Sequence, residues 1–137
     1  MKKVLSYLML VTILSLTLFS SCKKDVDDRD AFIGTWNVME NWSNPYGGSG
    51  TDNYTINISK SSSTSNGIII TSLGGVYYNF TINATVSGSS VTIPNQTINS
   101  GGDLYNVSGS GTISGSTMNF TYYVLDGWTG ICTATKL

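Results

Sequence analysis

Apolar and polar residues alternate through most of the chain from residue 31 onward. The alternation is clearest over 76–86, where every second residue is apolar. A period of two is typical of a β-strand with one buried face. No stretch of this region has the 3.6-residue period of an amphipathic helix. Eight segments are therefore expected to be strands: 32–40, 54–59, 68–71, 76–86, 91–98, 105–113, 117–125 and 128–136.

The segments between these strands are short and rich in glycine, serine and asparagine. Short connections join antiparallel neighbours, and an eight-stranded meander can close on itself and lose its exposed edges. We therefore expect an all-β domain, an eight-stranded antiparallel up-and-down barrel. A two-sheet β-sandwich is the alternative, because it has the same strand pattern. Within 91–98, Pro94 predicts an edge or a bulge, and Gly109 and Gly111 predict bending or close backbone approach in the next strand.

The first 22 residues follow a different pattern. Two lysines precede an apolar run over 4–18, which is too short for a comfortable membrane-spanning helix. The run ends in small residues before Cys22, and this arrangement resembles a bacterial lipobox, with Phe19 where leucine is usual. The resemblance implies a signal peptide over 1–21 and a Cys22 that carries acyl chains such as palmitate, which anchor a protein stably to a membrane. An ordinary secretory signal is the alternative.

Residues 22–30 are expected to be the lipidated cysteine and a charged, flexible tether. The stretch 23–30 holds three basic and four acidic residues with a single apolar side chain, too little apolar surface to order itself. A surface-export tag is the alternative. Lysine at position 24, where aspartate resembles an inner-membrane retention signal, favours the outer membrane, on its periplasmic face or at the cell surface.

Composition excludes several classes of function. Charged residues make up 11% of the chain and its net charge is −1, so no basic field is present to hold nucleic acid. The chain has no histidine, which rules out an ordinary catalytic triad and an imidazole metal ligand. Cys132 is the only thiol left after lipidation and is expected to be a small core residue. The sequence predicts neither an enzyme, a cofactor nor a metal site, and carries no signal for an oligomeric state.

A family resemblance appears in the first strand. Gly34-Thr35-Trp36 resembles the G-x-W motif of lipocalin-like (calycin) barrels, in which the tryptophan closes the bottom of the barrel. Together with the strand count, this resemblance implies a lipocalin-like domain over 31–137 of a small bacterial lipoprotein. The arginine that usually packs over the tryptophan has no counterpart, because Arg29 precedes the strand.

One end of such a barrel is expected to differ from the other. Alternate loops of a meander lie at the same end, and one set gathers all four carboxylates of the domain with three aromatic residues. The predicted binding rim at this end consists of Trp42, Tyr46, Asp52, Asp103, Asp126 and Trp128. Aromatic faces beside carboxylates can stack on a sugar or attract a cation. The alternative is that the aspartates serve turn chemistry and the tryptophans are exposed by chance.

Seven aromatic residues are expected to point into the barrel: Trp36, Tyr54, Tyr78, Phe80, Tyr105, Phe120 and Tyr122. They either line an apolar cavity or fill the barrel, and each buried tyrosine hydroxyl needs a partner. The expected function is a non-enzymatic, lipid-anchored envelope protein that binds a small apolar or carbohydrate-like ligand at the open end. The alternative is a protein-interaction module with a filled barrel, such as an envelope inhibitor, an adhesin-like subunit or an assembly component.

Overall fold

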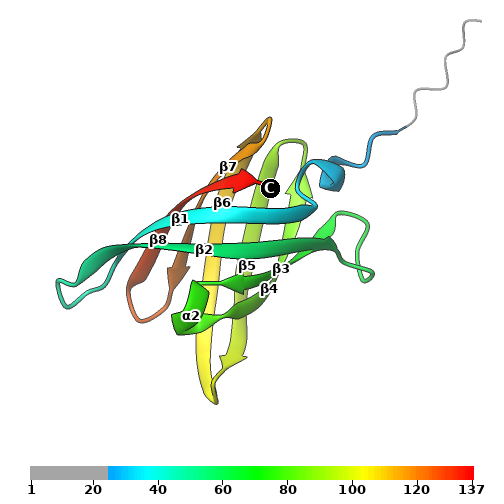
Figure 1. Ribbon diagram of the computed structural model, residues 1–137. Coiled ribbons are helices and arrows are strands. Elements are labelled where there is room, and N and C mark those ends of the chain that lie inside the picture. Colours follow the sequence, from blue (N-terminus) through cyan, green and yellow to red (C-terminus); the bar gives the residue numbers. More distant parts are fainter. Residues whose placement is uncertain (1–24) are drawn as a thin grey trace, which may run out of the picture.

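The chain forms one closed antiparallel barrel of eight strands (Figure 1). The computed structural model describes residues 25–137, so the predicted signal peptide, Cys22 and the first residues of the tether lie outside the described residues. Each strand pairs with the next, and β1 also pairs with β8, which closes the sheet. The predicted up-and-down barrel is confirmed. The strands are β1 Gly34–Ser43, β2 Ser49–Lys60, β3 Gly67–Leu73, β4 Phe80–Ser87, β5 Ser90–Ser100, β6 Asp103–Ser114, β7 Thr117–Val124 and β8 Trp128–Lys136.

Several strands are longer than the sequence predicts. The predicted loop over 41–53 is mostly strand, because β1 and β2 stay paired up to Ser43 and Ser49. Only a tight turn joins them, and in it the Asn44 Oδ1 atom accepts hydrogen bonds from the backbone N–H groups of Tyr46, at 3.0 Å, and Gly48, at 2.9 Å. Asparagine stabilises turns in this way, so the polar composition of 41–53 belongs to a long hairpin and not to a loop.

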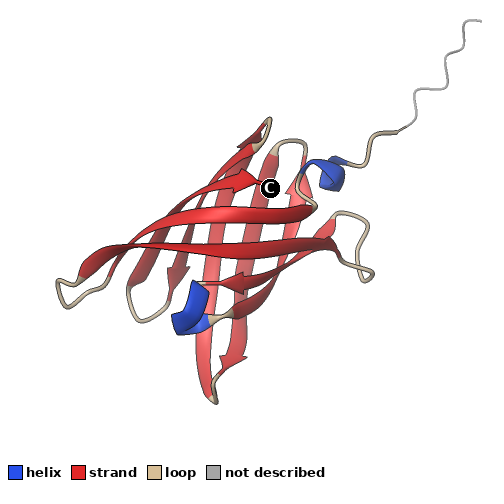
Figure 2. Cartoon of the chain, in the orientation of Figure 1, coloured by secondary structure: helices blue, strands red, loops and turns tan. Residues whose placement is uncertain are grey.

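The segment 76–78, predicted as the start of the fourth strand, is a helical turn, so that prediction was wrong. The element α2 spans Gly75–Tyr78, and β4 begins only at Phe80. Gly74 and Gly75 have positive φ angles of 78° and 58°, a conformation that glycine adopts at little cost. Before this turn, the register of β3 with β4 shifts between Ile70 and Leu73, where Ser72 has a positive φ angle of 66°. Figure 2 shows α2 at the opposite end of the barrel from the other short helix, η2 (Asp28–Ala31).

The barrel interior is filled with apolar side chains over most of its length. Trp36, Phe80, Phe120 and Tyr122 are buried, as the alternation predicts. Tyr54, Tyr78 and Tyr105 are half-buried and pack against this core, Tyr78 from the α2 turn rather than from a strand. The register of β5 with β6 shifts between Ile93 and Gln96, so the bulge predicted at Pro94 is present.

We call one end of the barrel the open end. It holds α2 and three turns, those between β1 and β2, between β5 and β6, and between β7 and β8. The other, closed end holds both the first described residues and the C-terminus (Figure 1). There the Trp36 Nε1 atom donates a hydrogen bond of 2.8 Å to the Phe32 carbonyl. The Lys136 Nζ atom lies 5.4 Å from the centre of the Trp36 ring and donates to the Ala31 carbonyl. Trp36 therefore sits in a fixed position at the base of the core.

Residues 27–30, predicted as part of a flexible tether, pack against the closed end, which corrects that prediction for this stretch. The Arg29 guanidinium reaches the carbonyls of Ser61, Thr64 and Gly67 in the connection between β2 and β3, at 3.4–3.5 Å. The Asp28 carboxylate accepts a hydrogen bond of 2.7 Å from the Gly88 N–H. Backbone carbonyl and N–H groups at the closed end thus hold a segment that has little apolar surface of its own. No helix among residues 25–137 is long and apolar enough to cross a membrane.

A candidate ligand site at the open end

The site is built around Glu40, a carboxylate inside the barrel. Glu40 follows Trp36 and Val38 at a spacing of two residues, so all three face inward from β1, and Glu40 is only 4% exposed. Its Oε2 atom accepts a hydrogen bond of 2.6 Å from the Tyr54 hydroxyl, and its Oε1 atom accepts one of 2.7 Å from the Tyr122 hydroxyl. These bonds satisfy both buried phenols, and among the described residues no buried side-chain polar atom lacks a partner.

A glycine on β8 makes room for one of these bonds. β8 lies between β1 and β7, and Gly130 is the partner of Trp42 on one side and of Tyr122 on the other. A Cβ atom at position 130 would collide with both the Tyr122 ring and the Glu40 Oε1 atom. The hydrogen bond between Tyr122 and Glu40 therefore passes over β8 at Gly130, because glycine has no Cβ atom to block it.

Burial sets the ionisation of the groups around Glu40. Loss of hydration is the main cause that raises the pKa of the Tyr54 hydroxyl, and of the Tyr122 hydroxyl, far above the usual value. It also raises the pKa of the Cys132 thiol, and the Glu40 carboxylate raises it further. Cys132 lies opposite Glu40 on β8, with its sulfur 3.9 Å from the Tyr54 hydroxyl oxygen. Both phenols and the thiol are thus neutral at physiological pH, so neither phenol can act as a base and the thiol is not a nucleophile.

Beyond Glu40 the barrel opens into a cavity of about 160 Å³, which we call the mouth cavity. Its lining residues are Glu40, Trp42, Asp52, Gly74, Tyr77, Tyr78, Tyr122 and Trp128. The barrel is therefore filled in its closed half and hollow at its open end. The sequence had left open whether the aromatic residues fill the barrel or line a cavity, and the structure shows that they do both.

The walls of the mouth cavity are mostly aromatic. The Trp42 and Trp128 rings lie 5.2 Å apart between centres and are tilted by 34°. Tyr78 meets the Trp128 ring edge-on at 5.7 Å and stacks on Phe80 at 4.9 Å. Asp52 lies directly opposite Glu40 in the pairing of β1 with β2, so the two carboxylates face the same side of the sheet. The arrangement offers flat aromatic faces beside two carboxylates.

The structure brings together half of the predicted rim. Trp42, Asp52 and Trp128 line the mouth cavity. The other three predicted rim residues are exposed at the same end without lining it: Tyr46, Asp103 and Asp126. Asp126 lies in the turn before β8 and Asp103 begins β6, positions that fit the turn-chemistry alternative.

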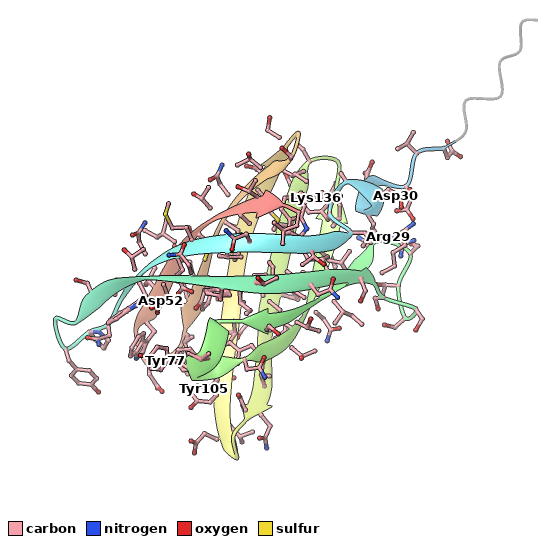
Figure 3. All side chains as sticks on the ribbon, in the orientation of Figure 1. Arg29, Asp30, Asp52, Tyr77, Tyr105 and Lys136 are labelled. Carbon is pink, nitrogen blue, oxygen red and sulfur yellow. The ribbon has the colours of Figure 1, made fainter. Side chains whose placement is uncertain are left out.

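Three of the lining residues, Glu40, Gly74 and Tyr77, were not among the predicted site or interior residues. Glu40 was assigned to the rim end but not to the predicted site, although the period of two already turned it inward beside Val38. Gly74 lies in a predicted turn and directly precedes α2. Tyr77 lies in α2, where a strand was predicted. Tyr77 is 78% exposed and stands at the lip of the cavity. Figure 3 shows Asp52, Tyr77 and Tyr105 at this end of the barrel, with Arg29, Asp30 and Lys136 at the other.

Within residues 25–137 no group of three or more histidine, cysteine, aspartate or glutamate side chains is placed to hold a metal ion. The mouth cavity holds aromatic and carboxylate groups. Its two carboxylates come from neighbouring strands, and one of them is already bound by two phenols.

Comparison with known proteins supports the fold. The chain matches the structure of a redesigned β-barrel with a TM-score of 0.57 and 16% sequence identity, over 82% of this chain and 97% of that one. At this level of identity the likeness concerns the closed barrel and not any ligand. No protein-family model and no curated protein matches the chain. The fold thus defines the class, a small eight-stranded antiparallel β-barrel protein.

Proposed function

We propose that this protein is a non-enzymatic, lipid-anchored envelope protein whose lipocalin-like barrel binds a small apolar or sugar-like ligand at its open end. The observation that carries the proposal is the mouth cavity, a hollow of about 160 Å³ with aromatic walls above the buried Glu40. Small-molecule sites are typically concave and largely apolar, with a few convergent polar groups. The mouth cavity has this character, and the rest of the interior is filled by the core.

The size of the cavity limits the ligand. An apolar cavity of about 150 Å³ accommodates one benzene ring, so the mouth cavity fits a single ring, of a sugar or of an apolar molecule. Buried side chains such as Val38, Phe120 and Cys132 occupy the barrel below it, which leaves no room for a long acyl chain along the axis. The ligand that we propose is a compact ring.

The lipocalin-like part of the proposal is supported by the closed end. The Trp36 of the G-x-W motif is completely buried there. The Lys136 ammonium covers its ring at 5.4 Å, so a lysine from β8 takes the place of the arginine that packs on this tryptophan in lipocalin-like barrels. A cation over a tryptophan face is favourable.

The non-enzymatic part is supported by how the polar groups are engaged. Both oxygens of Glu40 accept hydrogen bonds from phenols, which suits a fixed acceptor better than a proton shuttle. The Cys132 thiol is buried and its pKa is raised, so little of the reactive thiolate forms. Neither group has the properties of a catalytic base or nucleophile.

The lipid anchor in this proposal gives the cavity a direction. Four residues lie between Cys22 and Asp27, so the two are at most about 18 Å apart along the chain. Asp27 is held at the closed end by Arg29 and by Lys60, at 2.7 and 2.8 Å. A lipid on Cys22 would thus place the closed end near the bilayer, with the mouth cavity facing away from it toward water-soluble ligands.

Native mass spectrometry tests the proposal. Residues 25–137 contain the closed barrel with its complete core. A protein of these residues is incubated with envelope extract and then measured. We expect an added mass of one small molecule that is lost on denaturation. Replacing Trp42 and Trp128 by alanine should abolish the added mass, whereas Tyr46→Ala, an exposed aromatic outside the cavity, should retain it. An added mass that survives the double replacement would contradict binding in the mouth cavity.

A second candidate is a protein-interaction module at the same end. It is favoured by three exposed side chains around the mouth, Tyr46, Val76 and Tyr77, which are 90, 94 and 78% exposed. Apolar side chains exposed together at one end of a protein can form the contact surface for a partner. Replacing Tyr46 and Val76, which do not line the cavity, by serine should weaken binding of a protein partner and leave a small ligand in the cavity, which separates the two functions.

A further inference from the structure

The charges of the described residues divide between the two ends of the barrel. The three cationic side chains among residues 25–137, those of Arg29, Lys60 and Lys136, are all at the closed end, where Asp27 and Asp30 pair with the first two. The open end holds the carboxylates of Glu40, Asp52, Asp103 and Asp126. None of the three cations reaches the mouth cavity. A ligand approaching the open end therefore meets negative charge only.

Glu40 keeps acceptor capacity toward the cavity. A carboxylate has about four lone-pair positions, and the Tyr54 and Tyr122 hydroxyls use one on each oxygen. Both phenols act as donors, so both oxygens of Glu40 act as acceptors. Glu40 is 4% exposed and has no cationic partner among the described residues. A buried carboxylate without a countercharge is costly, and a positively charged ligand would supply that countercharge.

The walls of the cavity suit the same ligand. The Trp42 and Trp128 rings and the Tyr78 ring surround the space, and the face of an aromatic ring attracts a cation. Asp52 adds a second carboxylate opposite Glu40. An anionic ligand would meet two carboxylates here, and a neutral sugar would leave the charge of Glu40 unbalanced.

We infer that the ligand of the mouth cavity is a ring-sized organic ammonium ion, whose nitrogen binds Glu40 and Asp52 and whose carbon skeleton packs against the adjoining Trp42 and Trp128 rings. This inference rests on the proposed binding of a small ring in the mouth cavity and assigns that ring a positive charge. Attraction between the ammonium and the carboxylates sets the affinity, and the aromatic walls select a flat or cyclic body.

Isothermal titration calorimetry at pH 7 tests the inference on residues 25–137. The probes are benzylammonium, neutral benzyl alcohol of nearly the same shape, anionic benzoate, and methyl glucoside as a neutral sugar. We expect benzylammonium to bind at least about tenfold more tightly than benzyl alcohol and benzoate to show no binding. We also expect the affinity for benzylammonium to fall as salt is added.

Matched variants identify which carboxylates contact the bound ammonium ion. Glu40→Gln should weaken benzylammonium binding at least about tenfold and leave benzyl alcohol binding unchanged. Asp52→Asn, at a half-buried position, should produce a smaller loss of the same kind and serves if Glu40→Gln fails to fold. Asp103→Asn removes the same charge from the same end outside the cavity and should change the affinity less than about twofold.

The outcomes separate this inference from the proposed function. If benzyl alcohol or methyl glucoside binds as tightly as benzylammonium, and does so without dependence on Glu40 or Asp52, the cation inference is overturned while binding in the mouth cavity stands. If no probe binds and no small molecule is carried over from envelope extract, both are overturned. If Asp103→Asn weakens benzylammonium binding as much as Asp52→Asn does, the negative charge of the whole open end explains the preference for a cation. Direct contact with the carboxylates of the cavity is then not needed, and the inference fails.

Discussion

Tyr122 on β7 donates a hydrogen bond of 2.7 Å to Glu40 on β1, and the bond spans the intervening strand β8 over Gly130. Two strands that do not pair with each other are thereby tied together inside the barrel. The bond forms the floor of the mouth cavity, since both residues line it. The carboxylate that we propose binds the ligand and the packing of the barrel thus depend on the same contact.

The first prediction concerns the glycine under this bond. Gly130→Ala should lower the free energy of unfolding by about 2 kcal/mol, because the added methyl group meets the Tyr122 ring and the Glu40 carboxylate. Urea denaturation measures the change. Thr135→Ala, on the exposed face of the same strand, is the control and should cost less than about 0.5 kcal/mol. Equal losses in the two variants would show that Gly130 is not a steric requirement.

Much of the fold could be predicted from the sequence, because alternation is a local signal. The period of two identified eight strands and their inward faces, and short turns implied antiparallel closure. The α2 turn was missed because Val76, Tyr78 and Phe80 keep the same alternation through it. Only the Gly74-Gly75 pair, which permits positive φ angles, could have indicated a break.

The site was predicted less completely, because it depends on contacts between strands. The sequence placed Trp42, Asp52 and Trp128 at one end but could not show which of the rim residues face a common hollow. That choice depends on the register that sets Glu40 opposite Asp52 and Trp42 opposite Gly130. Register is fixed by turn geometry and by core packing over the whole barrel, and neither can be read from a single strand.

The second prediction concerns the partners of Glu40. Glu40→Ala should destabilise the fold by about 2–3 kcal/mol, because it leaves the Tyr54 and Tyr122 hydroxyls buried without an acceptor. Glu40→Gln retains one oxygen acceptor and the same shape and should cost less than about 1 kcal/mol. Thermal and urea unfolding measure both. A Glu40→Ala variant as stable as Glu40→Gln would mean that the hydroxyls find other partners.

The third prediction concerns alkaline pH. The pKa of Tyr122 and that of Tyr54 are raised in the folded state, so the folded protein keeps these protons while the unfolded chain releases them above about pH 10. The stability from these groups is complete below that pH and is lost as the pH rises, by about 1.4 kcal/mol per pH unit for each phenol. Tyr122→Phe should reduce this slope between about pH 10 and 12 by one such contribution. Tyr46→Phe, at an exposed phenol, is the control and should leave the slope unchanged.

The fourth prediction concerns the N-terminal segment. The Arg29 hydrogen bond, followed by that of Lys60, holds the pKa of Asp27 well below its usual range. A lowered folded pKa stabilises the fold above the unfolded value of about 3.9, and this stability is lost as the pH falls below it. Asp27→Asn should lower the Tm by a few degrees at pH 7 and have little effect near pH 2. An equal loss at both pH values would contradict an electrostatic role for the segment.

We propose that this protein binds its ligand in the mouth cavity, and the three tryptophans of the chain allow one direct measurement. Each indole N–H gives its own signal in a heteronuclear NMR spectrum of isotope-labelled residues 25–137. Trp42 and Trp128 line the cavity, whereas Trp36 is buried at the closed end. Titration with ring-sized probes should shift the Trp42 and Trp128 signals together, with saturation, and leave the Trp36 signal in place. Signals that stay fixed with every probe, or a Trp36 signal that moves as much as the others, would contradict the account.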